Sequence, residues 1–298
     1  YLSPLMFCKG SVEITAYPAQ KDSIARLTYS PLSTFYTVAN QTVSNNPNAR
    51  KVQFTRNWLE NGNEILVRGN VSSIRKDWIN MYKSQDFFMH TFRERLGFKG
   101  ITVPEYSYGE CPSDSASHLL GSFYHQLSDV LAPMMKKSDN LNAEAVFYHL
   151  AFNDTLTKSI GGKHGAMAVE AFIDSLGLKH TDYRIADGRG VALYNYISPE
   201  LIVSFLKHAY SDKRNYGILY NSLPIAGIDG TLQYRMKESK AYKNVRAKTG
   251  TVTGGSSLAG YAKAANGHNL SFAIINQNVL EAKKARLFQN RICEELCR

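Results

Sequence analysis

The chain has 298 residues, and its 35 lysines and arginines outnumber its 25 aspartates and glutamates, which gives a formal charge of +10 at pH 7. With 44% apolar and 20% charged residues, the composition is that of a folded globular protein, which excludes a disordered or collagen-like chain. No apolar run reaches the roughly 18 residues of a membrane-spanning helix. At about 150 residues per domain, we expect two domains.

The basic residues are scattered along the chain rather than gathered in one segment. The densest runs are pairs such as Lys136-Lys137 and Lys283-Lys284. Nucleic-acid binders usually concentrate their lysines and arginines on one face, often with aromatic residues between them. We therefore expect no nucleic-acid partner. Two explanations remain for the net positive charge. Either the basic surface serves only solubility, or it faces an anionic neighbour such as a cell wall or a membrane surface.

Cysteine and histidine patterns predict no metal site. The chain has eight histidines without an H-E-x-x-H unit, and its four cysteines form no C-x-x-C pair. Cys293 and Cys297 are four residues apart in a helical pattern and share a face. We expect ordinary thiols and no cofactor; a disulfide in an oxidising compartment is the alternative.

The first 75 residues have the pattern of β-strands. Apolar residues alternate with polar ones over 12–16 and again over 52–54, which is the period of a half-buried strand. Asn61-Gly62 follows the second run and precedes the apolar residues 65–67. Asn-Gly between two apolar runs predicts a hairpin, because both turn positions favour positive φ.

After Lys76 the pattern becomes helical and returns to strands near the C-terminus. Apolar residues at helical spacing from Trp78 to Leu96 predict a helix after Lys76, with Gly97 as the residue that follows its end, and then a loop over 105–117. Ser198-Pro199 has the features of a helix start. The other predicted helices are 118–135, 141–152, 166–176 and 280–297. The predicted strands are 245–252, 257–264 and 270–276, the last two joined by Asn266-Gly267.

Two short motifs contain residues that suit acyl-transfer chemistry. The strand carrying Lys248-Thr249-Gly250-Thr251 offers a positive charge, hydroxyls for a carboxylate, and a glycine that lets a substrate approach. A backbone N–H of that strand can face an oxyanion. In Ser138-Asp139-Asn140, the serine can relay a proton and the amide can bind a carbonyl. Each motif alone is weak, since these residues also occur by chance in strands and helix caps.

The two motifs together are specific. S-D-N precedes K-T-G by 110 residues, and both belong to the signature S-x-x-K, S-D-N, K-T-G of penicillin-recognising serine enzymes. The chain resembles the D-alanyl-D-alanine carboxypeptidases/endopeptidases, the low-molecular-mass class C penicillin-binding proteins. The resemblance lies in YLSPL (1–5), KSDNLNAE (137–144), DGRGVALYN (187–195), LPIAGIDGTL (223–232) and RAKTGTVTGGSSLAGY (246–261).

This resemblance implies an α+β fold (an α/β sandwich) of the β-lactamase/transpeptidase type, with an antiparallel sheet flanked by helices. It implies a serine-type hydrolase that cleaves D-Ala-D-Ala or cross-linked stem peptides of peptidoglycan through an acyl-enzyme and is inhibited by β-lactams. No metal or cofactor is implied. A cell-wall substrate implies a periplasmic or other extracytoplasmic location, and peripheral association with the membrane or wall stays open.

The resemblance also assigns roles to individual residues. Ser138 would relay a proton to the leaving amine, Asn140 would bind the acyl side's amide, and Lys248 would stabilise charge in the site. The Thr251 N–H would form half of the oxyanion hole, and the threonines would hold the terminal carboxylate. The substrate-binding residues are thus Thr249, Gly250 and Thr251.

The sequence departs from the family pattern in two places. The family's Asp-Gly-Ser-Gly-Leu-Ser-Arg-Tyr-Asn stands here with Arg189, Val191, Ala192 and Leu193, so the loop's serine and arginine are replaced. The family's S-x-x-K serine lies upstream of the segment that resembles residues 1–5. We therefore expect the nucleophile to precede this chain, and this chain alone to be inactive.

Ser73-Ile-Arg-Lys76 is an alternative nucleophile motif. It precedes S-D-N by 65 residues, a spacing that class A β-lactamases approximate. The chemistry would need Ser73 at a buried helix N-terminus with Lys76 one turn later. The residues that follow, including Asp77, Asn80 and Lys83, favour the exposed start of an amphipathic helix instead. A β-lactamase-like enzyme that uses Ser73 remains an alternative function.

These observations predict two domains. Residues 1–75 would be the C-terminal part of a β-rich inserted domain. Residues 76–298 would be a transpeptidase-like domain that is incomplete at its N-terminal side. A non-catalytic wall-binding protein on the same fold is the second alternative function.

Overall fold

The computed structural model describes residues 3–109, 118, 121–152 and 160–298. The chain forms two compact units, Tyr1–Leu119 and Leu120–Arg298. The strand β6 (Arg75–Asn80) and the helix α1 (Ser84–Gly97) therefore belong to the first unit, whereas the sequence predicted a boundary after residue 75. The assignment of these N-terminal residues to an inserted domain stays a prediction.

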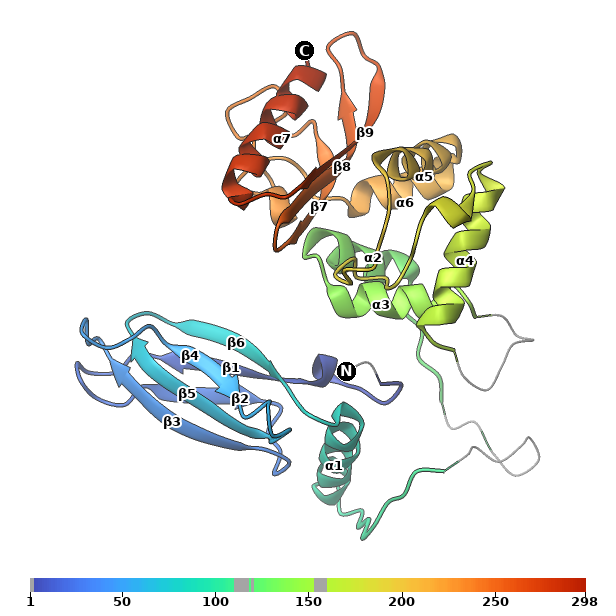
Figure 1. The fold of residues 1–298 in the computed structure, drawn as a ribbon. Helices are drawn as coiled ribbons and strands as arrows, with labels where there is room; N and C mark the ends of the chain where they lie inside the picture. The colour runs from blue at the N-terminus through green and yellow to red at the C-terminus, as the bar shows by residue number, and fades with distance from the viewer. Residues whose placement is uncertain (1–2, 110–117, 119–120, 153–159) are drawn as a thin grey trace. The chain divides into compact units, whose positions relative to one another are not determined.

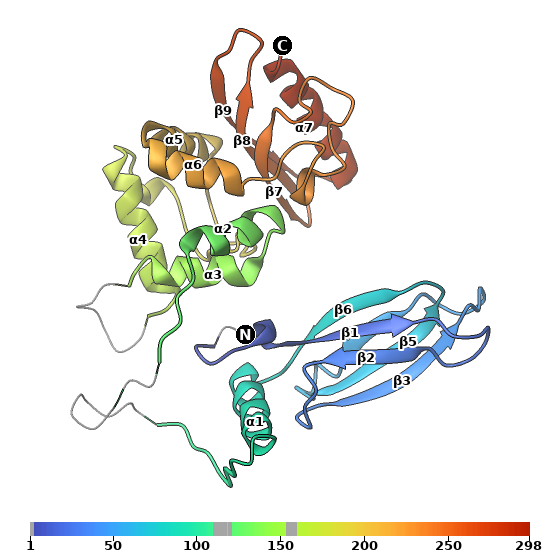
Figure 2. The ribbon, with the colours of Figure 1, turned by 180° about the vertical axis from the view of Figure 1, so that it is seen from behind.

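The first unit contains two three-stranded sheets and one helix. One sheet has the order β2-β1-β6, with all strands antiparallel, and the other has the order β3-β5-β4, in which β3 runs parallel to β5. Apolar residues of β1, β5 and α1 form a shared core, so the sheets pack against each other (Figures 1 and 2). The elements are β1 (Ser11–Tyr17), β2 (Arg26–Ser30), β3 (Thr37–Ser44), β4 (Gln53–Arg56), β5 (Glu64–Val71), β6 (Arg75–Asn80) and α1 (Ser84–Gly97), after the short 3₁₀ turn η1 (Cys8–Gly10).

The expected β-strands of this unit are confirmed, but the helix expected from residue 76 is wrong there. β6 occupies the beginning of that range and pairs with β1, and α1 starts only at Ser84. Ile79 and Met81 are buried while Trp78 is 57% exposed, which is the alternation of a strand. The apolar residues that suggested one helix thus belong to two elements, and β2 and β3 were not expected.

The second unit is built on an antiparallel sheet between helices. Its order is β7-β8-β9, and alternate residues of β8 face opposite sides. Leu258 packs with Cys293 of α7 on one face, and Tyr261 packs with Leu206 of α5 on the other. Figure 1 shows α7 and α5 on the two sides of the sheet. The elements are α2 (Leu127–Lys136), α3 (Asn140–His149), α4 (Gly162–Ser175), η2 (His180–Asp182), α5 (Pro199–Ser211), α6 (Lys213–Ser222), η3 (Gly230–Leu232), β7 (Arg246–Val252), β8 (Gly255–Lys263), β9 (Asn269–Gln277) and α7 (Ala282–Leu296).

Most expected elements of this unit are confirmed. Ser198 caps α5, because its Oγ accepts a hydrogen bond from the Leu201 N–H at 3.2 Å. Gly267 has φ +88° in the β8–β9 turn, as the Asn-Gly pair indicated. α2 begins at Leu127 rather than at 118, and α6 was not expected. The antiparallel sheet flanked by helices agrees with the predicted α+β fold class.

The cysteines of the described residues are free thiols. Cys8, Cys293 and Cys297 are free, and Cys111 lies outside the described residues. Burial raises the pKa of Cys293 to about 12, which makes its thiol unreactive at neutral pH. Within the described residues, no cluster of His, Cys, Asp and Glu could hold a metal ion, and no helix has the length and apolar character to cross a membrane.

Candidate active site

The turn between α2 and α3 presents Ser138. α2 ends at Lys136, and Ser138 adopts a left-handed conformation with φ +56°, which is unfavourable for a residue other than glycine. Asp139 then caps α3, since its Oδ1 accepts hydrogen bonds from the Leu141 and Asn142 N–H groups at 3.1 and 3.2 Å. The Ser-Asp-Asn motif therefore does form a helix cap, through its aspartate. The side chains of Ser138 and Asn140, on either side of Asp139, are both exposed.

Lys248 of β7 meets Ser138 directly. The Lys248 Nζ donates hydrogen bonds to the Ser138 Oγ and to the Thr249 carbonyl oxygen, both at 2.7 Å. Ser138 is exposed and Lys248 is half-buried. Burial lowers the pKa of Lys248, because the charged form loses hydration. The two sequence motifs are thus joined by a charge-assisted hydrogen bond.

This contact borders a cavity of about 260 Å³. One side of the cavity is apolar and comes from α2 and α3, and the other side is polar. Asn140, the first residue of α3, lies on its wall together with Ser138 and Lys248. The lining residues are Met134, Met135, Ser138, Asp139, Asn140, Ala143, Val146, Phe147, Leu150, Gly188, Arg189 and Lys248.

The rest of the Lys-Thr-Gly-Thr strand runs along an open sheet edge. The Thr249 Oγ1 donates a hydrogen bond to the Thr231 Oγ1 at 2.8 Å, and Thr251 is exposed. A Cβ on Gly250 would collide with the Oγ of Ser257 on β8 unless that hydroxyl rotates away. Thr249, Gly250 and Thr251 do not line the cavity that holds Lys248.

The backbone N–H groups of Thr249 and Thr251 point to that open edge. The Ala247 N–H donates to the Pro224 oxygen at 3.0 Å, on the side of β7 opposite to β8. Because N–H direction alternates along a strand, every second residue after Ala247 points the same way. Among the described residues, no strand pairs with this edge beyond Arg246. An extended peptide could therefore add to β7 here.

A segment before β7 ties the turn that carries Ser138 to this strand. The Lys136 Nζ donates to the Asp229 Oδ2 at 2.5 Å and to the Leu223 oxygen at 3.1 Å. The Asp229 Oδ1 accepts a hydrogen bond from the Ile225 N–H at 2.8 Å. The Lys136–Asp229 ion pair thus connects the end of α2 with the loop that also provides Thr231.

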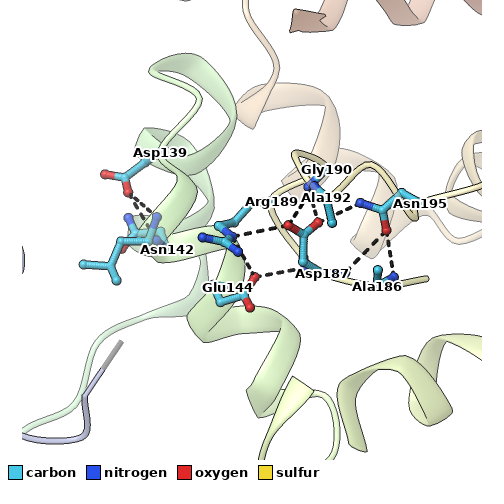
Figure 3. Close-up of polar contacts among 11 residues, drawn as sticks. Asp139, Asn142, Glu144, Ala186, Asp187, Arg189, Gly190, Ala192 and Asn195 are labelled. Carbon is cyan, nitrogen blue, oxygen red and sulfur yellow. Dashed lines mark hydrogen bonds and ion pairs between the residues drawn. The ribbon is translucent and has the colours of Figure 1, made fainter. Parts of the chain in front are cut away.

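A second loop, residues 186–195, lies beside α3 (Figure 3), and its Gly188 and Arg189 line the cavity. The buried Asp187 carboxylate accepts hydrogen bonds from the Gly190 and Ala192 N–H groups at 2.8 and 3.1 Å and from the Asn195 Nδ2 at 2.7 Å. The Asn195 Oδ1 in turn accepts the Ala186 N–H at 2.8 Å. This network holds the loop in one conformation.

Arg189 lies between this loop and α3. Its Nε is 3.5 Å from the Glu144 Oε2 and 3.4 Å from the Asp187 Oδ2, and Glu144 also accepts the Gly188 N–H at 3.0 Å. The arginine side chain remains 45% exposed and lines the cavity. The loop that lost the family's serine and arginine therefore carries a cation again, at a different position.

Sequence reasoning did not assign roles to the residues that hold these loops. Lys136 directly precedes the 137–144 stretch of the family resemblance, and Glu144, Asp187 and Asp229 lie inside quoted stretches. Polar residues in those stretches were the available signal. Their partners are distant in sequence, since Lys136 and Asp229 are 93 residues apart, and no local pattern pairs them.

Neither Ser-x-x-Lys sequence has the geometry that the nucleophile motif requires. Ser73 is exposed in a bend, and Lys76 lies on β6, where its Nζ forms an ion pair with Glu13 at 2.8 Å. The exposed helix start expected at Ser73 is therefore also wrong. A second instance, Ser204-Phe-Leu-Lys207, was missed in the sequence and lies within α5, away from a helix N-terminus and outside the cavity lining.

Comparison with known proteins identifies the family. The model of the D-Ala-D-Ala carboxypeptidase 3 (S13) family matches residues 2–295. The chain belongs to this family. The family resemblance read from Ser-Asp-Asn and Lys-Thr-Gly is thereby confirmed.

Two curated relatives illustrate the extent of the match. The D-alanyl-D-alanine carboxypeptidase DacB of Haemophilus influenzae is 33% identical over 148 residues, covering 49% of this chain and 30% of that protein. A D-alanyl-D-alanine carboxypeptidase of Actinomadura sp. (strain R39) is 33% identical over 204 residues, covering 63% of this chain and 36% of that protein. The matched part thus spans about a third of the length of these S13 relatives.

Solved structures show the same fold. The crystal structure of penicillin binding protein 4 from Haemophilus influenzae matches with a TM-score of 0.75 at 23% identity, covering 99% of this chain and 67% of that chain. A second structure of that protein, complexed with a β-lactam, matches with a TM-score of 0.69 at 22% identity and covers 99% and 70%. The fold expected for the S13 family is therefore present here.

The Lys136–Asp229 ion pair is expected to stabilise the second unit. We predict that Asp229→Ala lowers its free energy of unfolding by about 1–2 kcal/mol, because two hydrogen bonds to a carboxylate that is 34% exposed are lost. Glu281→Ala is the control, since the exposed Glu281–Lys284 pair contributes about 0.5 kcal/mol or less. Urea denaturation followed by circular dichroism measures both. Equal losses in the two variants would contradict the assignment.

The environment of Lys248 is expected to alter its titration. Because burial lowers its pKa, the ammonium should lose its proton at a lower pH than a lysine in a solvated model peptide does. A ¹³C NMR titration of the lysine side chains, with the Lys248 signal assigned from Lys248→Arg, measures this. If Lys248 titrates like the model peptide, its ammonium is solvated and the described burial is absent in solution.

Proposed function

We propose that this chain carries part of the active site of a serine-type D-Ala-D-Ala carboxypeptidase/endopeptidase that acts on peptidoglycan stem peptides and is inhibited by penicillins. The observation that carries the proposal is the 2.7 Å hydrogen bond between Lys248 and Ser138 at the mouth of the cavity. The S13 family membership supports it, as does the β-lactam complex of the structurally similar Haemophilus protein. A wall substrate places the enzyme outside the cytoplasmic membrane.

The arrangement suggests how the substrate lies. A stem peptide that adds to the open edge of β7 would meet the N–H groups of Thr249 and Thr251, and the Thr251 N–H would stabilise the oxyanion. The side chains of the two threonines would hold the terminal carboxylate, next to the positive charge of Lys248. Asn140, which lines the cavity with Ser138 and Lys248, would bind the amide on the acyl side.

The reaction then needs an attacking serine and a path for its proton. The serine Oγ forms an ester with the carbonyl carbon of the penultimate D-alanine, the peptide C–N bond breaks, and the proton reaches the leaving amine through the Ser138 hydroxyl. Water hydrolyses the ester in a second step. Lys248 supports the relay, because its ammonium donates a hydrogen bond to the Ser138 Oγ. This bond fixes the orientation of the Ser138 hydroxyl.

We place the attacking serine in sequence outside these 298 residues. Ser73 and Ser204 lack the helix N-terminal geometry that would activate them, as described above. The β-lactamase alternative that uses Ser73 therefore loses its structural support. In the same proposal, the residues of this chain bind substrate, relay a proton and stabilise charge.

Acylation by benzylpenicillin, followed by intact-mass analysis, tests the proposal. We expect no stoichiometric adduct on the 298-residue chain, and a single adduct on the longest natural form of the protein. In that form, Ser138→Ala and Lys248→Ala should each lower the acylation rate about a hundredfold, since the first removes the proton relay and the second removes the cation that supports it.

The exposed Lys240→Ala variant is the matched control and should acylate at the parent rate. Circular dichroism confirms that each variant is folded. An adduct on the short chain that disappears in Ser73→Ala would instead establish Ser73 as the nucleophile. A folded long form that is never acylated would favour the non-catalytic wall-binding protein.

A further inference from the structure

We propose that a basic surface on the second unit docks the protein on anionic phospholipid bilayers. The surface consists of Lys237, Lys240 and Lys243, together with Lys263 at the end of β8. The first three belong to residues 233–246, which contain five lysines and arginines and a single acidic residue, Glu238. This inference does not depend on the catalytic proposal.

Residues 233–246, which carry three of these lysines, are anchored to the core by apolar side chains. Met236, Ala241 and Val245 are buried in the core with α7. The Arg235 guanidinium turns inward, where its Nε and Nη2 donate to the Asn290 Oδ1 at 2.9 and 2.8 Å. The segment therefore lies along α7 (Figures 1 and 2), and Arg235 is not part of the basic surface.

Aromatic rings order two of the exposed ammonium groups. The Lys237 Nζ lies 5.2 Å from the ring centre of Tyr234, and the Lys243 Nζ lies 5.2 Å from that of Tyr242. The Tyr242 ring is itself fixed, because it packs on Gly227, where a Cβ would collide with it. Cations that are already ordered lose less conformational entropy when they bind an anion.

A groove of about 450 Å³ lies beside these lysines. Lys243 and Lys263 line it together with Tyr220 and Tyr242. Asn244 joins the two basic residues, because its Nδ2 donates to the Lys263 oxygen at 2.7 Å and its Oδ1 accepts the Lys263 N–H at 2.8 Å. None of the residues that line the groove is acidic, so its charge suits a phosphate group.

Two acidic residues lie near the basic surface. Glu238 follows Lys237 in the chain and is exposed. Glu294 acts on Cys297, a residue of the groove wall, whose pKa is raised by burial and further by Glu294. The four lysines of the basic surface outnumber these two carboxylates, so its local charge stays positive.

The exposed tyrosines favour a bilayer over a soluble polyanion as the partner. Tyr234 is 79% exposed and Tyr242 is 39% exposed, next to the lysines that stack on them. Tyrosine rings are enriched at the level of lipid headgroups, where an apolar body and a polar tip are both accommodated. Several lysines beside such rings are attracted by anionic lipids. A soluble polyphosphate chain would need the lysines but not the exposed rings.

Vesicle co-sedimentation tests the inference. We expect the 298-residue protein to bind vesicles of phosphatidylcholine mixed with phosphatidylglycerol, and not vesicles of phosphatidylcholine alone. Binding should fall steeply as salt is added. The double variant Lys237→Glu and Lys243→Glu should lower the partition coefficient at least tenfold. Inorganic phosphate at moderate concentration should not compete at constant ionic strength, because it lacks the surface charge density of a bilayer.

The control variant Lys163→Glu and Lys179→Glu has the same change in net charge, at exposed lysines on and after α4. It should keep at least half of the binding. Circular dichroism establishes that both variants are folded. Equal losses in the two variants would overturn the proposal, because net charge alone would then explain the binding. Tight binding to soluble polyphosphate without binding to the mixed vesicles would also overturn it.

Discussion

The contact between Lys248 and Ser138 is the constraint on which the site depends. A lysine that is half-withdrawn from water loses hydration of its charge, as its lowered pKa shows, and two hydrogen bonds offset that cost. One of these bonds requires the α2–α3 turn to lie against β7. Ser138 has a left-handed φ, and its hydroxyl meets the ammonium group in this conformation. The helix that follows, capped by Asp139, stabilises the turn.

Two loops from different parts of the chain stabilise this meeting point, and glycines allow both to approach closely. Gly230 has φ +56°, and a Cβ there would lie 2.7 Å from the Lys136 oxygen. At Gly188, a Cβ would lie 2.8 Å from the Ala143 oxygen on α3. Each loop also contributes a carboxylate network, through Asp229 and Asp187. The same unit thus combines a rigid site with an open edge of β7 on which a peptide could lie.

The sequence predicted the parts of this unit that have local signals. The strands around Lys248, the hairpin turn at Gly267 and the cap at Ser198 all depend on neighbouring residues, and the structure confirms them. The family resemblance, not periodicity, assigned Ser138 and Lys248 to one site, and their direct hydrogen bond was not predicted. The secondary-structure prediction failed where pairing with a distant strand determines the element. Residues 75–80 form a strand because β1 pairs with them. The Lys136–Asp229 contact has no local pattern, and it could not be predicted from one sequence.

In the proposed mechanism, Asn140 and the open edge of β7 bind a D-Ala-D-Ala terminus next to Ser138 and Lys248. An NMR titration of the 298-residue chain with an N-acylated D-alanyl-D-alanine peptide tests it most directly. We predict shifts of the Asn140, Thr249 and Thr251 amides that saturate with the D,D-peptide, are absent with the L,L-peptide and disappear in Lys248→Met. Identical responses to the two stereoisomers, or shifts confined to residues outside this site, would contradict the account.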